Sequence, residues 1–329
     1  MAKCNLTLCH LNVQSLLSNV NVNQHVSSQY SKLDEIYTTL VNDHGFDIIA
    51  LSETWLNAAH LDCDVTIEKY ECFRKDRVCG RGGGLIIYVQ NDIPCIRRAD
   101  LESTTGCEMM CIEVRYGENN SNKVFMCLCY RPPGQNADDI SNFIIDVQTC
   151  LDQMYSEKPD CVVLTGDFND RAVIFYEDHQ TSELGNKLRD LVVCNNLFQL
   201  IDQPTHFTQT SAYILDLMIT DSPGYVCESG TLLPISELHH VPVFAKFTFQ
   251  KYVPPSFSRQ VWHYNNADWE ALNSDLSKIT WSDLLGSNVE IDTAITRLTN
   301  TYIDTARKHI PVRNIKVRSK DKPWVTPKL

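Results

Sequence analysis

The sequence contains no run of about 18 consecutive apolar residues, which excludes a helix that spans a membrane. Its first residues, Met1-Ala2-Lys3-Cys4-Asn5, lead straight into a strand-like stretch, without the long apolar core and cleavage site of a secretory signal. Internal repeats and low-complexity tracts are also absent. With 43% hydrophobic and 21% charged residues, the composition is that of an ordinary globular protein, which we expect to be intracellular.

The 14 cysteines include no Cys-x-x-Cys pair and no spacing typical of a zinc ribbon. Most of them stand in apolar runs, as Cys161 and Cys194 do. Cys9 and His10 are neighbours, but two ligands do not make a metal site. We therefore expect reduced, buried cysteines that behave as small hydrophobic residues.

Positive charge is scarce in most of the chain. Residues 251–329 carry 12 Lys and Arg against 8 Asp and Glu, and residues 1–250 hold the remaining 17 basic and 33 acidic residues. An acidic segment offers no large electrostatic funnel for nucleic acid, so this balance counts against tight, autonomous DNA binding. The basic stretch Arg313–Trp324 is either a solvated tail or a contact for nucleic acid or a partner.

Short apolar runs with the length and β-branched content of buried strands recur through the first 250 residues. They are Asp47–Ser52, Leu85–Val89, Met109–Val114, Lys123–Tyr130, Cys161–Thr165, Leu215–Thr220 and Val243–Phe249. Three helical patterns lie among them, at residues 33–41, 140–154 and 184–192. The mixture predicts an α/β fold of packed sheets flanked by helices, and not a purely parallel, doubly wound sheet.

The character of the sequence changes after Phe249. Tyr252-Val253-Pro254-Pro255-Ser256 is typical of a linker, and helical patterns follow near Trp269–Ile279 and Ile291–Ile310. We therefore predict a domain over residues 1–250 and a helical appendage over residues 251–329.

Polar groups stand where several apolar runs end. In Gly166-Asp167-Phe168-Asn169, a carboxylate and an amide two positions apart point the same way from a strand end. Taken alone, Asp-x-Asn is also the pattern of an Asx turn. Other runs end in or begin with polar residues too, namely Asn12, Glu53, Tyr130, Asp216 and His240. One such residue is often satisfied locally, but so many favour convergence on a single site.

In this order, these motifs resemble those of the endonuclease/exonuclease/phosphatase superfamily, which includes abasic-site endonucleases, pancreatic-type deoxyribonucleases and inositol phosphatases. Further motifs resemble the endonuclease of jockey-like non-LTR retrotransposons: Ser52-Glu53-Thr54-Trp55-Leu56, Gly82-Gly83-Gly84, Tyr130-Arg131-Pro132-Pro133-Gly134 and Gln203-Pro204-Thr205. The resemblance spans residues 5–250. It implies a four-layer αββα sandwich, in which two mainly antiparallel or mixed sheets are flanked by helices as in DNase I.

The resemblance also implies an activity and a context. The activity is a metal-dependent DNA endonuclease that nicks a target strand, so that its 3′-hydroxyl primes reverse transcription. Residues 251–329 resemble the connection to a reverse transcriptase, with Asp321-Lys322-Pro323-Trp324 just before the polymerase. The implied partners are DNA and a C-terminal reverse transcriptase of a longer polyprotein, and the implied location is nuclear, at least transiently.

Carried over residue by residue, the resemblance implies a metal site and a base. Glu53, with Asn12 nearby, would hold Mg²⁺, a hard cation that prefers oxygen ligands. Asp167 would orient and deprotonate the attacking water.

Other residues would act on the phosphate. Asn169 and Tyr130 would contact its oxygens, and His240, oriented by Asp216, would present a charged N–H to it.

Three arginines extend this implied substrate site. Arg131 lies next to Tyr130, and Arg74 and Arg77 (with Arg81) are candidates for contacts to backbone phosphates, although solvated surface arginine is the ordinary interpretation. Gly82-Gly83-Gly84 leads into a strand and not a helix, so we interpret it as a turn and not a phosphate cradle.

Two positions depart from the family pattern. The chain has Leu238-His239-His240 where the family has Ser-Asp-His, and Gln14 stands where many relatives have Asp. Neutral imidazole is a poor Mg²⁺ ligand, so we predict His239 as a third metal ligand better suited to Mn²⁺. Two alternatives follow: a catalytically impaired remnant that binds DNA or a partner, or a phosphatase for small phosphorylated substrates.

Overall fold

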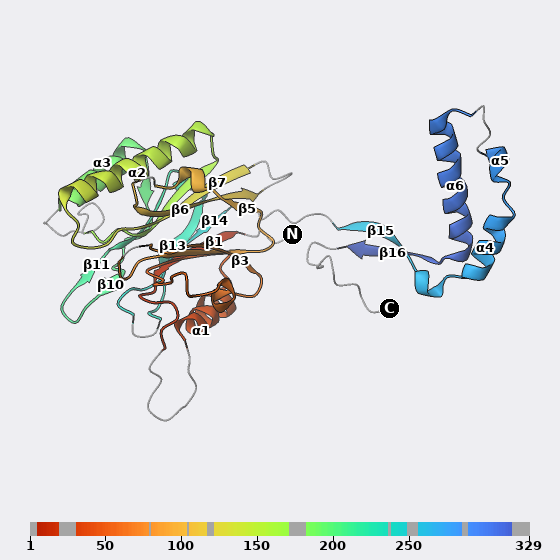
Figure 1. Cartoon of the computed structure of the whole chain (residues 1–329). Coiled ribbons are helices and arrows are strands. Elements are labelled where there is room, and N and C mark those ends of the chain that lie inside the picture. Colours follow the sequence, from red (N-terminus) through yellow and green to blue (C-terminus); the bar gives the residue numbers. More distant parts are fainter. Residues whose placement is uncertain are drawn as a thin grey trace, which may run out of the picture. The chain divides into compact units, whose positions relative to one another are not determined.

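A computed structural model describes residues 5–19, 31–78, 80–103, 105–116, 122–170, 182–235, 238–248, 256–284 and 289–317. The chain divides into two compact units, Met1–Tyr252 and Val253–Leu329 (Figure 1). Most of the expected linker, residues 252–255, and the Asp321-Lys322-Pro323-Trp324 stretch lie outside the described residues. Within the described part, no helix combines the length and apolar character needed to cross a membrane.

The first unit contains two six-stranded sheets. One has the order β13-β14-β1-β2-β4-β3, and its strands are Val226–Thr231, Val243–Phe247, Leu6–Asn12, Ile48–Ser52, Leu85–Gln90 and Tyr70–Lys75. The other has the order β5-β6-β7-β8-β12-β9, and its strands are Cys95–Arg97, Glu108–Tyr116, Asn122–Tyr130, Cys161–Asp167, Asp216–Thr220 and Phe198–Gln199. In each sheet one central pair is parallel, β1 with β2 and β7 with β8, and the other pairs are antiparallel.

Helices cover the outer faces of both sheets (Figure 1). On one side lie α2 (Ala137–Ser156) and α3 (Glu183–Cys194), and on the other lies α1 (Lys32–Ile36), which continues as a π-helical segment, Tyr37–Asp43. Asn136 and Ser182 cap α2 and α3 by accepting backbone N–H groups of their first turns.

Side chains that alternate along the strands form three apolar layers. Leu8, Ala50, Met126 and Val163 belong to the layer between the sheets, whereas Phe125 belongs to the layer beneath α2 and α3. A third layer lies between the first sheet and α1. The predicted αββα sandwich is therefore confirmed.

The second unit contains α4 (Trp269–Ser277), α5 (Trp281–Leu284), α6 (Ile291–His309) and a two-stranded ribbon. Its small core joins Leu272 of α4 to Ala306 and Ile310. The ribbon pairs β15 (Phe257–Trp262) with β16 (Val312–Val317). Residues 313–317, the first part of the basic stretch, thus form a paired strand in which Arg313, Asn314 and Lys316 are exposed.

Gly166 permits the close approach of β7 and β8, the two strands that carry Tyr130 and Asp167. A Cβ atom built at Gly166, whose φ is 145°, would lie 1.8 Å from the carbonyl oxygen of Cys129. We expect Gly166→Ala to lower the free energy of unfolding by about 3 kcal/mol or more, because backbone cannot yield as a side chain can. Urea unfolding measures the change.

Gly106→Ala is the matched control, since Gly106 also has a positive φ, 98°, but its Cβ would meet nothing within 4 Å. Backbone conformation alone should cost about 1 kcal/mol there. Equal losses in the two variants would contradict a steric role for Gly166.

Candidate active site

Strand register brings the polar strand ends of both sheets together. Asp167, at the end of β8, pairs with Tyr130 at the end of β7 and with Asp216 at the start of β12. In the other sheet, Asn12 ends β1 beside Ser52, and Glu53 follows directly. The carboxyl ends of neighbouring parallel strands share one sheet edge, and both central parallel pairs end here.

Asp167 lies at the centre of this group and is fully buried. Asn12 donates from Nδ2 to Oδ2 of Asp167 at 2.8 Å and to Oε1 of Glu53 at 2.9 Å, which links the two sheets. Asn169 donates its backbone N–H to Oδ1 of Asp167 at 2.9 Å and its side-chain amide to Oδ2 at 3.0 Å. These donors fix the plane of the carboxylate.

The loop that carries Glu53 is held in a strained conformation. Glu53 and Trp55 have φ values of 54° and 55°, a region that L-residues seldom occupy. Thr54 and Trp55 donate their backbone N–H groups to the carbonyls of Gly84 and Gly83, and the Trp55 indole donates to Oε2 of Glu53 at 3.1 Å. Gly83 and Gly84, in the segment expected to be a turn, therefore anchor the Glu53 loop through their carbonyls.

Asp216 stands between two histidines. Its Oδ2 accepts from Nδ1 of His240 at 2.7 Å, and its Oδ1 lies 3.6 Å from Nδ1 of the fully buried His10. Thr205 Oγ1 accepts the backbone N–H of Asp216 at 3.0 Å. Nε2 of His240 points to Asp167, 3.9 Å from its Oδ2, which is beyond hydrogen-bonding distance and leaves that N–H available to another acceptor.

Burial and mutual charge shift the protonation of this group. Burial, followed by the charge of Asp216, raises the pKa of Asp167 to about 7. Burial lowers the pKa of His240, but the charge and hydrogen bond of Asp216 with the charge of Asp167 outweigh it and raise that pKa to about 9. Burial also lowers the pKa of His10 to about 4, against the effect of Asp216. Near neutral pH the group therefore holds a charged His240 and an uncharged His10.

The donor set fits a hard cation at one end. Glu53 is partly exposed, and each of its oxygens accepts one hydrogen bond, so both keep acceptor capacity toward solvent. Asn12 adds an amide oxygen beside it. Ligand atoms of Asp167, Asp216 and His240 also lie within 4.8 Å of one another, but all three residues are buried and already linked by hydrogen bonds or charge. Glu53 is thus the more accessible carboxylate, whereas Asn12 is buried and its amide oxygen also accepts the backbone N–H of Gln14 at 3.2 Å.

His239 does not join this group. The residue is exposed, its Nδ1 faces the carbonyl oxygen of Phe207 at 3.2 Å, and its ring lies 6.0 Å from that of His206. The side chains of consecutive residues in extended backbone point to opposite sides. Because the His240 side chain points into the site, that of His239 points toward solvent. This placement speaks against the predicted metal ligation by His239.

The arginines expected to bind phosphate are tied to the protein itself. All five N–H donors of Arg74 are used, by Asp62, Asp76 and the carbonyls of Asn57 and His60, which leaves none for a phosphate. That expectation for Arg74 is corrected.

Arg131 and Arg77 also bind internal groups. Buried Arg131 donates to the carbonyls of Phe168 and Asn169, so it braces the loop after β8 and does not present its charge to a substrate. Arg77 pairs with Glu108, and its Cζ lies 5.6 Å from the centre of the Tyr130 ring, so it borders the site.

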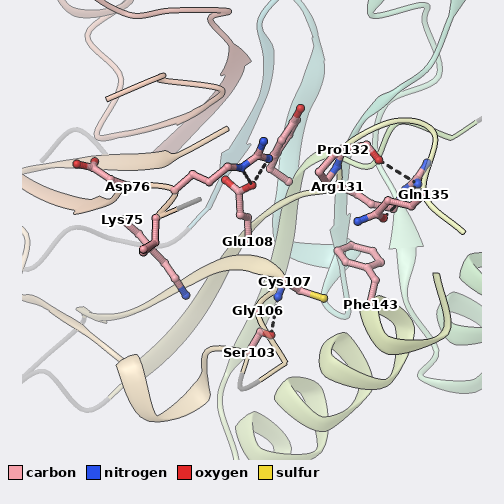
Figure 2. A pocket seen from close by; sticks show the side chains of 13 residues that line it. Lys75, Asp76, Ser103, Gly106, Cys107, Glu108, Arg131, Pro132, Gln135 and Phe143 are labelled. Atoms are coloured by element: carbon pink, nitrogen blue, oxygen red, sulfur yellow. Dashed lines mark hydrogen bonds and ion pairs between the residues drawn. The ribbon is translucent and has the colours of Figure 1, made fainter. Parts of the chain in front are cut away.

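A cavity of about 520 Å³ adjoins the site at Tyr130 (Figure 2). Lys75 and Glu108 line one side, and Arg131, Gln135 and Phe143 line the other. The wall is thus polar toward β3 and partly apolar toward α2.

Sequence reasoning did not assign a role to His10, Thr205 or His206. His206, in the hairpin of β10 (His206–Phe207) and β11 (Ala212–Tyr213), packs its ring 4.6 Å from that of His240. The only signal in the sequence was Gln203-Pro204-Thr205, which was recognised as a motif without a role. His10 lies in an apolar strand, where a histidine gives no sign of its partner.

Comparison with known proteins agrees with this geometry. The model of a family described as endonuclease-reverse transcriptase matches residues 124–243, which include Tyr130, Asp167, Asp216 and His240. No curated protein matches the sequence.

Several solved structures have the same fold. The endonuclease domain of TRAS1, a telomere-specific non-LTR retrotransposon, has a TM-score of 0.56 at 12% identity and covers 75% of this chain and 100% of its own. The AP endonuclease LMAP from Leishmania major has a TM-score of 0.57 at 13% identity, and the match covers 74% of this chain and 87% of that structure. The Xenopus laevis APE2 catalytic domain has a TM-score of 0.56 at 12% identity, and the match covers 74% of this chain and 92% of that structure. The chain thus shares the fold of these nucleases, and its residues 124–243 match the endonuclease-reverse transcriptase family model.

Proposed function

We propose that the chain is a metal-dependent endonuclease that cuts a phosphodiester bond of DNA. The observation that carries this proposal is the arrangement of buried Asp167 between Asn12, Asn169 and the Nε2 atom of His240. A carboxylate with a pKa of about 7 beside a charged imidazole is suited to remove a proton from water and to stabilise a phosphate oxyanion.

Asp167 acts as the general base. Its two oxygens accept hydrogen bonds from the amides of Asn12 and Asn169, which hold the carboxylate in one orientation. A water bound there loses its proton to Asp167 as it attacks phosphorus.

His240 supplies positive charge on the opposite side of the same gap. Asp216 holds the imidazole through Nδ1, so Nε2–H points toward Asp167 and is available to a non-bridging oxygen of the phosphate. This positive charge stabilises the phosphate most strongly in the transition state, when phosphorus is bonded to a fifth oxygen.

Glu53 and Asn12 would hold a divalent cation, Mg²⁺ or Mn²⁺, which when bound neutralises charge on the phosphate and on the leaving oxygen. Trp55 and Asn12 orient the Glu53 carboxylate through its two oxygens. Burial, followed by the charge of Glu53, raises the pKa of Tyr130. Tyr130 therefore stays protonated and donates to a phosphate oxygen.

We further propose the biological setting. The match to an endonuclease-reverse transcriptase family supports a DNA substrate and a retrotransposon polyprotein, in which the second unit leads toward a reverse transcriptase. Nicking of chromosomal DNA would require the protein to be nuclear during that step.

Nicking of supercoiled plasmid tests the activity and the role of Asp167. We expect nicking with Mg²⁺ or Mn²⁺, none with EDTA, and a loss of about 10²–10⁴-fold in Asp167→Asn, since the base is removed. Asp146→Asn is the matched control, because Asp146 is a buried carboxylate that accepts from Ser103 and Thr105 outside the site. Intact folding without nicking by wild-type protein under any metal would indicate a binding domain instead.

The pH dependence of nicking follows from the two shifted groups. The basic form of Asp167 appears as pH rises through about 7, and the acidic form of His240 is lost as pH rises through about 9, so kcat/KM should be bell-shaped between those values. In Asp216→Asn the descending limb should move to lower pH, because the charge that raises the pKa of His240 is gone. An unmoved descending limb would argue against His240 as the acid.

His239→Ala tests the placement of that residue. Because His239 is exposed and faces Phe207, we expect the Mg²⁺ and Mn²⁺ dependence of nicking to change by no more than about twofold, as for ordinary surface substitutions. Glu53→Gln is the contrasting variant and should raise the metal concentration required. A comparable rise in His239→Ala would restore His239 as a ligand.

A further inference from the structure

Four cysteines come together in the apolar layer between the second sheet and its helices. Cys111 lies on β6, Cys127 and Cys129 lie on β7, and Cys150 lies on α2. Cys111 and Cys127 are direct partners in the strand register. We call these residues the thiol cluster.

The sulfur atoms of the thiol cluster face one another. Sγ of Cys111 lies 3.0 Å from that of Cys127 and 3.6 Å from that of Cys150, and Sγ of Cys127 lies 3.8 Å from that of Cys129. The Sγ atoms of Cys111, Cys127 and Cys150 all lie within 4.8 Å of one another. All four cysteines are free thiols, and none is more than 1% exposed.

These distances suit thiolates around one ion. Zinc binds sulfur at about 2.3 Å, so the sulfurs of a tetrahedral site lie roughly 3.8 Å apart. The Cys111–Cys150 distance of 3.6 Å is already close to that value, and the 3.0 Å between Cys111 and Cys127 needs a small rotation of either side chain. The surroundings are mostly apolar, and the carbonyl oxygen of Leu101 lies 3.9 Å from Sγ of Cys111, so sulfur dominates the donor set and favours a soft cation over Mg²⁺ or Ca²⁺.

We propose that Cys111, Cys127 and Cys150 together bind one soft d¹⁰ cation, zinc(II) or copper(I). Each ligating thiol gives its proton to solvent as the sulfur–metal bond forms. Because the thiol cluster is closed to solvent, the ion enters as the chain folds and not afterwards.

This site is separate from the nuclease site. The thiol cluster lies on the helix-facing side of β7, whereas Tyr130 belongs to the layer between the sheets. A bound ion would join β6, β7 and α2 just before β7 reaches Tyr130, and it would take no part in the cleavage step.

Two other cysteines show what an isolated buried thiol looks like. Cys9 and Cys161 are fully buried, but the sulfur of Cys9 faces the carbonyl of His10 and that of Cys161 faces the hydroxyl of Thr220. Burial raises the pKa of Cys161 to about 12, which leaves it a thiol. Cys161 is therefore the matched control.

The experiment measures metal in the full chain, produced in medium supplemented with zinc or copper and dialysed against EDTA to clear oxygen-ligand sites. We expect about one zinc or copper per chain by mass spectrometry of the elements. Cys150→Ala should lower that occupancy by more than about tenfold, because even the loss of a residue that only supports a metal ligand can weaken metal binding by that factor. Cys161→Ala should leave the occupancy unchanged. Protein produced with Cd²⁺ should show a thiolate-to-metal absorption band that Cys150→Ala lacks.

Cys150→Val fills the space of the lost sulfur and keeps the test valid if the alanine variant unfolds. Circular dichroism checks that each variant is folded. Metal-free wild-type protein, metal retained in folded Cys150→Val, or a Cys111–Cys127 disulfide in non-reducing mass spectrometry would each overturn the proposal. The ratio of zinc to copper decides between the two ions.

Discussion

The burial of Asp167 is the constraint on which the site depends. A carboxylate withdrawn from water is costly unless hydrogen bonds and opposite charge compensate it. Asn12 and Asn169 supply the hydrogen bonds and His240 supplies the charge, and each comes from a different part of the chain. The two sheets must therefore pack in one register for this carboxylate to be tolerated.

The same constraint explains the backbone around the site. Gly166 lets β8 approach β7 closely, and the positive φ of Asn169 turns the chain so that its amide returns to Asp167. Gly83 and Gly84 accept from the loop of Glu53 and hold its strained backbone. Strain near the site is thus supported by backbone hydrogen bonds and by the close packing of neighbouring segments.

Most charges in and around the site are paired with one another within the protein. Asp216 carries two histidines of unlike character, because His240 also faces Asp167 whereas His10 is surrounded by the core. The arginines near the site mostly neutralise the protein's own carboxylates, as Arg77 does with Glu108. The proposed binding of DNA by the acidic first unit would therefore rely on local charge such as that of His240.

Local sequence determined the strands, the helices and the polar residues at strand ends. Alternation of apolar residues and the cap residues of α2 and α3 act over a few positions, so they can be seen without the fold. The pairing of β15 with β16 was not predicted, since the two strands are far apart in sequence and only half of their residues are apolar.

Only tertiary structure decided which polar residues meet. His10 and Asp216 are more than 200 residues apart, and nothing local links them. Arg74 and His239 matched an expected role by type, but packing turned one toward internal carboxylates and the other away from the site. Side-chain direction depends on register between distant strands, and a one-residue change of register reverses it, which is why the sequence alone named the candidates and the fold selected among them.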